Sequence, residues 1–457
     1  LTDGTREVFL RYAATDALLP LELHAAIMGK IAYEGRDTAQ FRELLGIEQR
    51  MIGVVASVER RGLFFDLEYS RRLEQALAVE QAETLAELEQ VVGWKINPES
   101  TPEIRALMAE RGHAPVKMKK TGPSWDKKAM QMLRERMVAQ GYVDPAVDLI
   151  EKSRELNTRM ATFVRGWQEA IASDGAVHCS FNSVGTATGR LSASPNCQNF
   201  PKPTTDPRYR NQIVARPGHV LVSIDFAQIE LRLAAEFARH DVLLDAFKHG
   251  ADPHAEMAKL CGLPRPEAKN ANFSLVYGAS PEVFAVTAKL SLARAREIHR
   301  RWWAANEAFR RWYREVAGEL AQHGYVTNVF GRRHHPPKTN EAVNFKPQSV
   351  VGDMAKRVML RMGASGGGWA MLNQVHDEWV VEVLPGAAQL YVTVASDGVA
   401  VHGDVSRGDV PYGNGAGVVV VYEGRVKLLY NAAEVDFSPP TADEVVQGVA
   451  VHSDVTQ

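Results

Sequence analysis

The sequence has few of the features that are typical of secreted proteins, of membrane proteins and of proteins with clustered metal sites. Its three cysteines, Cys179, Cys197 and Cys261, are odd in number and too widely spaced for a disulfide framework or a clustered metal site. No uninterrupted apolar run approaches the roughly 18 residues that a membrane helix needs, and Leu1–Leu10 lacks the basic-then-apolar order of a signal peptide. We therefore expect a cytoplasmic protein in a reducing compartment, without a membrane partner.

Neither basic nor acidic residues are in large excess. The chain has 53 Lys and Arg against 55 Asp and Glu, a formal net charge of −2, which argues weakly against a nucleic-acid partner. Residues 384–457 contain 3 basic and 9 acidic residues, which leaves a net charge of +4 on residues 1–383. With 45% hydrophobic and 24% charged residues, the chain is typical of a soluble globular protein. Its length predicts roughly two to four domains.

Helical spacing of apolar residues dominates residues 47–112 and returns later in the chain. Further helices are predicted at 229–247, 266–277, 282–290 and 293–322. The basic stretch "VKMKKTGPSWDKK" is either a solvated loop or a flexible arm that contacts DNA phosphates. From residue 384 the chain is rich in Val and Gly and repeats "GVAVHGDVS" as "GVAVHSDVT", which favours a β-rich unit.

Two expected β elements end in carboxylates. The stretch "VLVSIDFAQIELRL" (220–233) starts as an apolar strand and continues as a helix, with Asp225 at the join. The stretch "MLNQVHDEWVVEV" (371–383) is typical of a β-hairpin with His376, Asp377 and Glu378 at its tip. A strand-end Asp is more often a helix cap, and an Asp-Glu pair at a hairpin tip is usually turn chemistry. If the two ends met, the carboxylates could hold two cations about 4 Å apart and support phosphoryl transfer.

The stretch "RPEAKNANFSLVYG" (265–278) places four functional side chains every four residues, namely Arg265, Lys269, Phe273 and Tyr277. Each step of four drifts by about 40°, so all four share one broad helix face. Two cations near the positive end of the helix dipole, followed by two rings, suit a triphosphate followed by a sugar and base. An amphipathic helix with its aromatics in the core is the alternative, but it does not explain the shared side of the two cations.

Together these stretches resemble the DNA polymerases of family A, the bacterial DNA polymerase I class with its phage relatives. "DFAQIELR" resembles the first palm motif, "RPEAKNANFSLVYG" the fingers-helix motif and "QVHDEWVVEV" the second palm motif. Further matches follow in the family's order at 178–201, 250–258, 324–337 and 341–356. The resemblance implies an α+β right-hand polymerase fold with a helical thumb, an antiparallel-sheet palm and helical fingers, plus an unmatched β-rich tail.

The resemblance also implies an order of domains. We expect a remnant end of a 3′–5′ exonuclease-like domain at 1–46, a thumb at 47–170, the palm at 171–232 and 346–383, the fingers at 233–345 and the unmatched tail at 384–457. In the first of these, "YAATDALLPLEL" resembles the last proofreading motif, with Tyr12 and Asp16 at the matching places. The other carboxylates of such a nuclease would lie upstream of Leu1, so 3′–5′ exonuclease activity is not expected of this fragment.

The implied function is DNA-templated DNA polymerisation, in which dNTPs are added to a primer 3′-hydroxyl in replication or repair. The compact segment between His254 and Arg265 slightly favours phage-like replication. Asp225 and Asp377 would bind two Mg²⁺ ions, for which Mn²⁺ can substitute, with help from the carbonyl of Phe226. Glu378 would support this catalytic site.

The resemblance assigns the remaining site residues to two partners, the incoming dNTP and primer–template DNA. The dNTP would contact Gln228, Glu230, His254, Arg265, Lys269, Phe273 and Tyr277. Within this set Glu230 would crowd the sugar 2′ position and select deoxynucleotides. The DNA would contact Lys119, Lys120, Arg190, Asn196, Gln198, Gln348 and His376, the lysines through phosphates and the others in the minor groove near the primer end. We expect a monomer, and a processivity factor is left open.

Departures from the family pattern keep rival functions open. Phe226, Ser274, Ser349 and Trp379 replace residues that the family usually has, and the segment after Val383 does not match the family's usual palm end. An altered palm would leave a catalytically impaired remnant that binds primer–template DNA without extending it. An RNA-making relative is a second rival, against which Glu230 argues, and a metal-dependent nuclease is a third.

Overall fold

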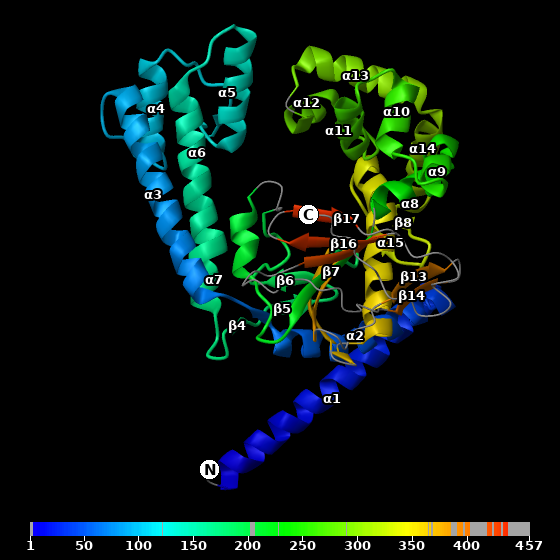
Figure 1. The fold of residues 1–457 in the computed structure, drawn as a ribbon. Helices are drawn as coiled ribbons and strands as arrows, with labels where there is room; N and C mark the ends of the chain where they lie inside the picture. Colours follow the sequence, from blue (N-terminus) through cyan, green and yellow to red (C-terminus); the bar gives the residue numbers. More distant parts are fainter. Residues whose placement is uncertain are drawn as a thin grey trace.

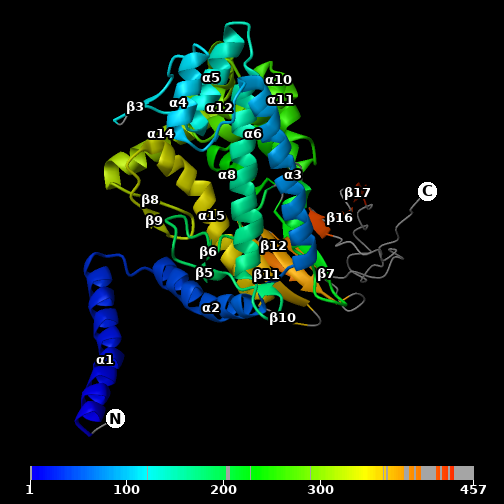
Figure 2. The same cartoon turned by 90° about the vertical axis from the view of Figure 1, so that its left-hand side faces the viewer.

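The computed structural model is a mostly helical α+β protein in which two groups of helices lie on either side of a sheet (Figure 1). It describes residues 3–120, 122–201, 206–226, 228–288, 290–363, 365–366, 369–384, 391–395, 398–402, 418–422, 425–430 and 433–436. In this part of the chain no helix is long and apolar enough to cross a membrane. The helix α1 (Asp3–Tyr33), which holds Tyr12 and Asp16, extends away from the rest of the molecule (Figure 2).

The first helical group forms the segment expected to be the thumb. Its helices are α3 (Leu67–Val92), α4 (Thr101–Glu110), α5 (Lys127–Ala139) and α6 (Pro145–Met160), and α6 runs through a π-turn (Ala161–Arg165) into α7 (Gly166–Ala170). The first four helices begin at side chains that accept a hydrogen bond from a first-turn amide: Asp66, Ser100, Asp126 and Asp144. The basic stretch forms a small hairpin of β2 (Met118–Lys119) and β3 (Gly122–Pro123) at α5.

The second helical group surrounds the largest buried core and corresponds to the expected fingers. It contains α8 (Ile229–Ala238), α9 (Asp241–Lys248), α10 (Pro253–Cys261), α11 (Arg265–Leu275), α12 (Pro281–Ala288), α13 (Leu292–Ala305) and α14 (Glu307–His323). The single helices predicted at 229–247 and 293–322 are each two helices. The breaks fall at His240 and Asn306, whose buried side chains share a 2.6 Å hydrogen bond. Each break therefore supplies the polar partner that the other needs when buried.

The central sheet has seven strands in the order β10-β11-β12-β7-β15-β16-β17. These are β10 (Ser365–Gly366), β11 (Trp369–Val375), β12 (Glu378–Val383), β7 (Val220–Asp225), β15 (Val418–Tyr422), β16 (Arg425–Tyr430) and β17 (Ala433–Asp436). The expected strand and hairpin are confirmed, and β12 pairs with both neighbours antiparallel. Within the segments expected to form the palm, the pairs β10–β11, β11–β12 and β12–β7 are all antiparallel, as expected. The tail extends this sheet, because β15 joins β7 in parallel and β16 pairs with β15.

Two helices, α2 (Ala39–Arg61) and α15 (Thr339–Met362), pack against the sheet. Their apolar side chains meet those of β7 and β12 in one core, which includes Met51, Val222 and Trp379. The part of α2 from residue 47 to Arg61, which we expected to belong to the thumb, thus packs against the sheet.

Shorter elements complete the fold. The strand pairs are β1 (Leu63–Phe64) with β4 (Ala176–Val177), β5 (Ser180–Asn182) with β6 (Ser192–Ser194), β8 (Val326–Thr327) with β9 (Arg333–His334), and β13 (Tyr391–Ala395) with β14 (Gly398–His402). A 3₁₀ turn spans Pro207–Gln212. The first copy of the tail repeat begins with β14, whereas the second copy, at 448–456, lies outside the described residues.

Candidate functional site

The two carboxylates singled out in the sequence lie side by side at one end of the sheet. Asp225 is paired with Glu378 in the ladder between β7 and β12, and the backbone N–H of Phe226 donates to the carbonyl oxygen of Asp377 at 3.1 Å. Opposed residues in such a ladder have Cα atoms about 5 Å apart. Asp225 is not the cap of the next helix, because α8 begins at Ile229 and its N-cap residue is Gln228, which has a left-handed backbone with φ of 50°.

The surroundings of Asp377 disfavour its negative charge. Burial raises the pKa of its carboxyl above the usual value, and the nearby carboxylates of Glu230 and Glu378 add to this effect. Glu378 itself accepts a hydrogen bond from the Ser223 hydroxyl and lies 4.0 Å from Arg210 Nη1. The end of the sheet is thus an acidic site that a cation would stabilise.

The donor set fits a hard divalent cation. Asp225, Asp377 and the carbonyl of Phe226 offer only oxygen ligands, which Mg²⁺ prefers, and Mg²⁺ commonly takes one or two carboxylates together with substrate phosphates and water. Within the described residues, no three His, Cys, Asp or Glu side chains form a ready-made cage. The protein side of the site is therefore a pair of carboxylates that is open to a substrate.

Two residues that depart from the family pattern, Phe226 and Trp379, pack against each other next to these ligands. The Phe226 ring packs edge-on against Trp379, with ring centroids 5.1 Å apart and an interplanar angle of 85°. Both rings are buried in the core between the sheet, α2 and α15. A phenyl ring cannot bind a hard cation, so the backbone carbonyl is the only group that Phe226 can offer to a metal.

The α11 face has the composition predicted from its spacing. Arg265, Lys269 and Phe273 are exposed, and Phe273 keeps 53% of its surface accessible, which excludes the alternative that it belongs to the core. Tyr277 lies just past the end of α11 and is half-buried. Arg265 donates to Asp252, the residue that caps α10. This hydrogen bond therefore links the exposed face of α11 to the N-terminus of α10.

Glu230 connects this face to the sheet side of the site. One of its carboxylate oxygens accepts a hydrogen bond from Arg190, and the other accepts one from the Tyr277 hydroxyl at 2.7 Å. Burial, and then the charge of Glu230, raises the pKa of the Tyr277 hydroxyl, so the phenol stays protonated and able to donate. Arg190 and Tyr277, which were predicted from separate motifs, thus both donate to the carboxylate of Glu230, which was predicted from a third.

His254 is buried between α10 and α11. Its ring lies 5.4 Å from that of Phe273, and its Nδ1 is 3.2 Å from the Nδ2 atom of Asn272. Burial lowers the pKa of the imidazole, the charge of Asp252 raises it, and the charges of Lys269 and Arg265 lower it. Sequence reasoning missed Asn272, although it stands inside the fingers motif and is buried on α11.

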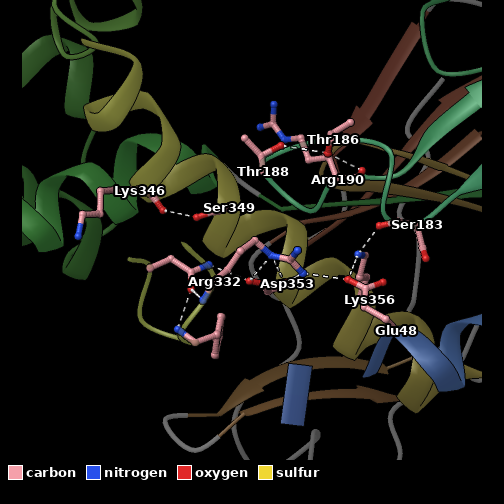
Figure 3. A network of polar contacts seen from close by, with 12 residues as sticks. Glu48, Ser183, Thr186, Thr188, Arg190, Arg332, Lys346, Ser349, Asp353 and Lys356 are labelled. Atoms are coloured by element: carbon pink, nitrogen blue, oxygen red, sulfur yellow. Dashed lines mark hydrogen bonds and ion pairs between the residues drawn. The ribbon is translucent and has the colours of Figure 1, made fainter. Parts of the chain in front are cut away.

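A buried polar network fixes the loop that carries Arg190 (Figure 3). Lys356 of α15 donates to the Ser183 carbonyl at 2.6 Å and to Glu48. The Thr186 hydroxyl donates to the Arg190 carbonyl at 2.8 Å. The backbone of Gly189, with φ of 73°, approaches the Arg332 side chain so closely that a Cβ atom would lie 2.6 Å from it. The loop therefore needs glycine at this position.

The Arg332 guanidinium in turn binds Asp353, with Nη2 and Oδ1 2.7 Å apart, and Glu48, at 2.9 Å. Charged groups buried in this way cost energy unless they are paired, and here each has a partner. Sequence reasoning missed these supporting residues because their spacing along the chain gives no signal.

The expected DNA contacts are spread over several elements. Asn196 and His376 are exposed, Gln348 lies half-buried on α15, and Lys119 and Lys120 lie on the β2–β3 hairpin with their side chains accessible. Gln198 differs, because it is buried and its Nε2 donates to the carbonyl of Gln374 at 2.8 Å. Gln198 therefore holds its loop against β11.

Comparisons with known proteins agree with this geometry. Residues 67–408 match DNA polymerase family A, so the chain belongs to that family. It is 30% identical over 414 residues to the thermostable DNA polymerase I of Thermus aquaticus, covering 84% of this chain and 49% of the relative. It is 32% identical over 406 residues to the DNA polymerase I of Pseudomonas aeruginosa, covering 81% and 43%. The chain thus spans about half the length of the curated relatives that it matches.

A solved structure is similar in fold. It is the POL domain of Pol1 from M. smegmatis in complex with DNA primer-template and dNTP, matched with a TM-score of 0.65 and 28% identity over 73% of this chain and 63% of that one. The family match also continues to residue 408, past residue 383, where the sequence resemblance ended. From the sequence we expected the whole tail to lie outside the family match. This is wrong for the start of the tail, because the match includes residues 384–408.

Proposed function

We propose that this protein is a DNA-templated DNA polymerase that adds dNTPs to the 3′-hydroxyl of a primer. The observation that carries the proposal is the meeting of Asp225 and Asp377 at the end of the sheet, together with Glu230, whose hydrogen bonds reach both the sheet side and the α11 face. Oxygen ligands for divalent ions beside a cationic and aromatic helix face suit the transfer of a nucleotide from a triphosphate.

The chain's own groups divide the work. Asp225, Asp377 and the Phe226 carbonyl would hold two Mg²⁺ ions, for which Mn²⁺ can substitute, and Glu378 would support them. When bound, the ions activate the primer hydroxyl and neutralise the leaving pyrophosphate. Arg265, Lys269 and His254 would bind the triphosphate, which the exposure of the two cations on α11 supports.

The sugar and base would lie farther along the same face. Phe273, Tyr277 and Gln228 would surround them, and Glu230, held by two hydrogen bonds, would crowd the sugar 2′ position. Because Glu230 is fixed from both sides, it cannot turn aside at low cost for a ribose hydroxyl.

Primer–template DNA is the partner that the site needs. The β2–β3 hairpin with Lys119 and Lys120 would hold duplex phosphates, and Arg190, Asn196, Gln348 and His376 would contact the minor groove near the primer end. Gln198 would act by positioning Asn196, because its own amide is used inside the protein. The solved relative's complex with primer-template DNA supports this partner.

Primer extension tests the proposal directly. The full chain, given a primer–template, four dNTPs and Mg²⁺, should add nucleotides according to the template and stop when EDTA is added. The rival, an impaired remnant, predicts salt-sensitive binding of the same DNA with no extension. Loss of both binding and extension would reject both. A role in replication or repair, a phage-like setting, a cytoplasmic location and a monomeric state stay predictions.

A further inference from the structure

We propose that Trp302 and Asn272 are positioning residues that fix the tautomer of His254, so that its Nε2–H is presented to the triphosphate. This inference rests on the proposed function for the identity of the ligand. Its structural basis is a chain of two hydrogen bonds across three helices, from Trp302 on α13 through Asn272 on α11 to His254 on α10. None of the three residues is more than 4% exposed.

The direction of each bond follows from the donors available. An indole N–H can only donate, so the atom of Asn272 that lies 2.9 Å from Trp302 Nε1 must be the acceptor Oδ1. The other end of the same amide is then the Nδ2 group, which can only donate to the His254 Nδ1 atom 3.2 Å away. Turning the amide over would set two donors against each other at the indole, at the cost of a buried hydrogen bond.

The imidazole must therefore accept at Nδ1. Because Nδ1 accepts from Asn272, it carries no proton, so the ring is neutral and its single proton lies on Nε2. Burial, which lowers the pKa of His254, favours this neutral form. Among the described residues, no hydrogen bond to this Nε2 atom is found. The imidazole thus has a donor ready for an acceptor that comes from outside the protein.

An anionic oxygen is the acceptor that this arrangement suits. The cations Arg265 and Lys269 lie close enough to lower the pKa of His254, while Asp252, which pairs with Arg265, raises it. A neutral Nε2–H can donate to a phosphate oxygen, whereas the opposite tautomer would present a lone pair and repel it. Fixing the tautomer removes the cost of selecting it when the triphosphate arrives.

Trp302→Phe is the main test, because it removes the indole N–H and keeps an aromatic ring in the core. We expect the KM for dNTP to rise roughly threefold to tenfold, the loss of about one neutral hydrogen bond, with kcat within about twofold. Trp312→Phe is the matched control, since Trp312 is a buried tryptophan of the same core that packs against Phe237 and Phe309. It should leave KM unchanged.

A double-mutant cycle separates positioning from general damage. Asn272→Leu should raise KM as much as Trp302→Phe or more, and adding Trp302→Phe to it should cause no further rise, because the chain is already broken. Independent, additive effects would overturn the proposal. Melting temperature and DNA binding are measured for every variant. DNA binding should stay unchanged in both, whereas Trp302→Phe should lower the melting temperature more than Trp312→Phe, because it leaves the buried Oδ1 of Asn272 without its donor.

The tautomer itself provides a readout that does not depend on activity. Long-range ¹⁵N–¹H spectra of the ¹⁵N-histidine-labelled protein, with the His254 signals assigned by His254→Gln, should show the Nε2–H form in the wild type and a mixture in Trp302→Phe. An Nδ1–H form in the wild type, or an unchanged spectrum in the variant, would overturn the inference. If the wild type failed to extend primers, the proposed function would fall, whereas these spectra would still decide the tautomer.

Discussion

Asp225 lies directly opposite Glu378 in the ladder between β7 and β12, and Asp377 is one residue away from that pair. This pairing brings two carboxylates of the proposed metal site together from positions that are far apart in the chain. We therefore predict that Asp225→Ala or Asp377→Ala lowers kcat for primer extension at least about 10³-fold, roughly 4 kcal/mol of transition-state stabilisation. Single-nucleotide incorporation under saturating DNA and dNTP measures the effect.

The loss should be confined to chemistry. Affinity for primer–template DNA, measured by fluorescence anisotropy, should stay within a few-fold because neither carboxylate is expected to contact DNA. Glu236→Ala, which removes an exposed carboxylate from α8, controls for the loss of one charge near the site. An Asp225→Ala variant that extends primers like the wild type would rule out the metal assignment.

Sugar selection should depend on Glu230 and on the residue that holds it. Glu230→Ala opens the space that we assign to the ribose 2′ position, so the preference for dNTP over rNTP should fall by at least about tenfold. Tyr277→Phe removes the 2.7 Å hydrogen bond to Glu230 but keeps the ring, and should relax the preference by a smaller factor. Competition between dNTP and rNTP in primer extension measures both, and undiminished selectivity in Glu230→Ala would refute the gate.

The sequence predicts the parts of this site whose signal is local. The four-residue spacing from Arg265 to Tyr277 predicts a shared helix face, and the apolar runs around Asp225 and Asp377 predict a strand end and a hairpin tip. The structure has the strand end and the hairpin tip, and α11 carries the exposed Arg265, Lys269 and Phe273. Tyr277 lies past the end of α11 and packs against the core. These local elements could be predicted because helix and strand periods act over a few residues.

Contacts between distant segments could not be predicted in this way. The helix breaks at His240 and Asn306 depend on a hydrogen bond across 66 residues, and the loop of Arg190 depends on the pairing of Lys356 with Glu48 and Ser183. The parallel addition of β15 to β7 likewise depends on tertiary packing. Buried polar partners such as Asn272 leave no periodic trace, since one residue is enough to satisfy another.

Because residue 273 is Phe rather than Tyr, its ring has no hydroxyl, and the protein should discriminate strongly against dideoxynucleotides. Its ring is exposed on α11 where we expect the sugar, but it offers no hydrogen bond that could replace the one lost with the nucleotide 3′-hydroxyl. Phe273→Tyr should reduce the preference for dNTP over ddNTP by about tenfold or more. Chain-termination ratios on one template measure the change. Phe273→Leu is the control, and an equal gain in that variant would show that ring removal, not the hydroxyl, is responsible.

The buried Asp144 at the start of α6 should make the group of helices α3 to α6 sensitive to acid. Burial alone would raise the pKa of its carboxyl, but hydrogen bonds from Arg111 and His113 lower the pKa to about 2. Because the folded pKa lies below the unfolded value of about 3.9, the stabilisation is fully present above that value and is lost as the pH falls through about 2. The contribution is roughly 2 kcal/mol near pH 7.

Asp144→Asn separates this charge effect from helix capping, because Asn is as good a cap as Asp. We expect the variant to lose roughly 2 kcal/mol of unfolding free energy at pH 7, and the difference from wild type to shrink below about pH 4 and vanish near pH 2. Hydrogen exchange of the α5 and α6 amides at several pH values measures it locally. Asp148→Asn is the control, since Asp148 is 49% exposed and its pair with Arg134 should contribute less than about 1 kcal/mol. A pH-independent loss in Asp144→Asn would mean that its ion pairs are not the cause.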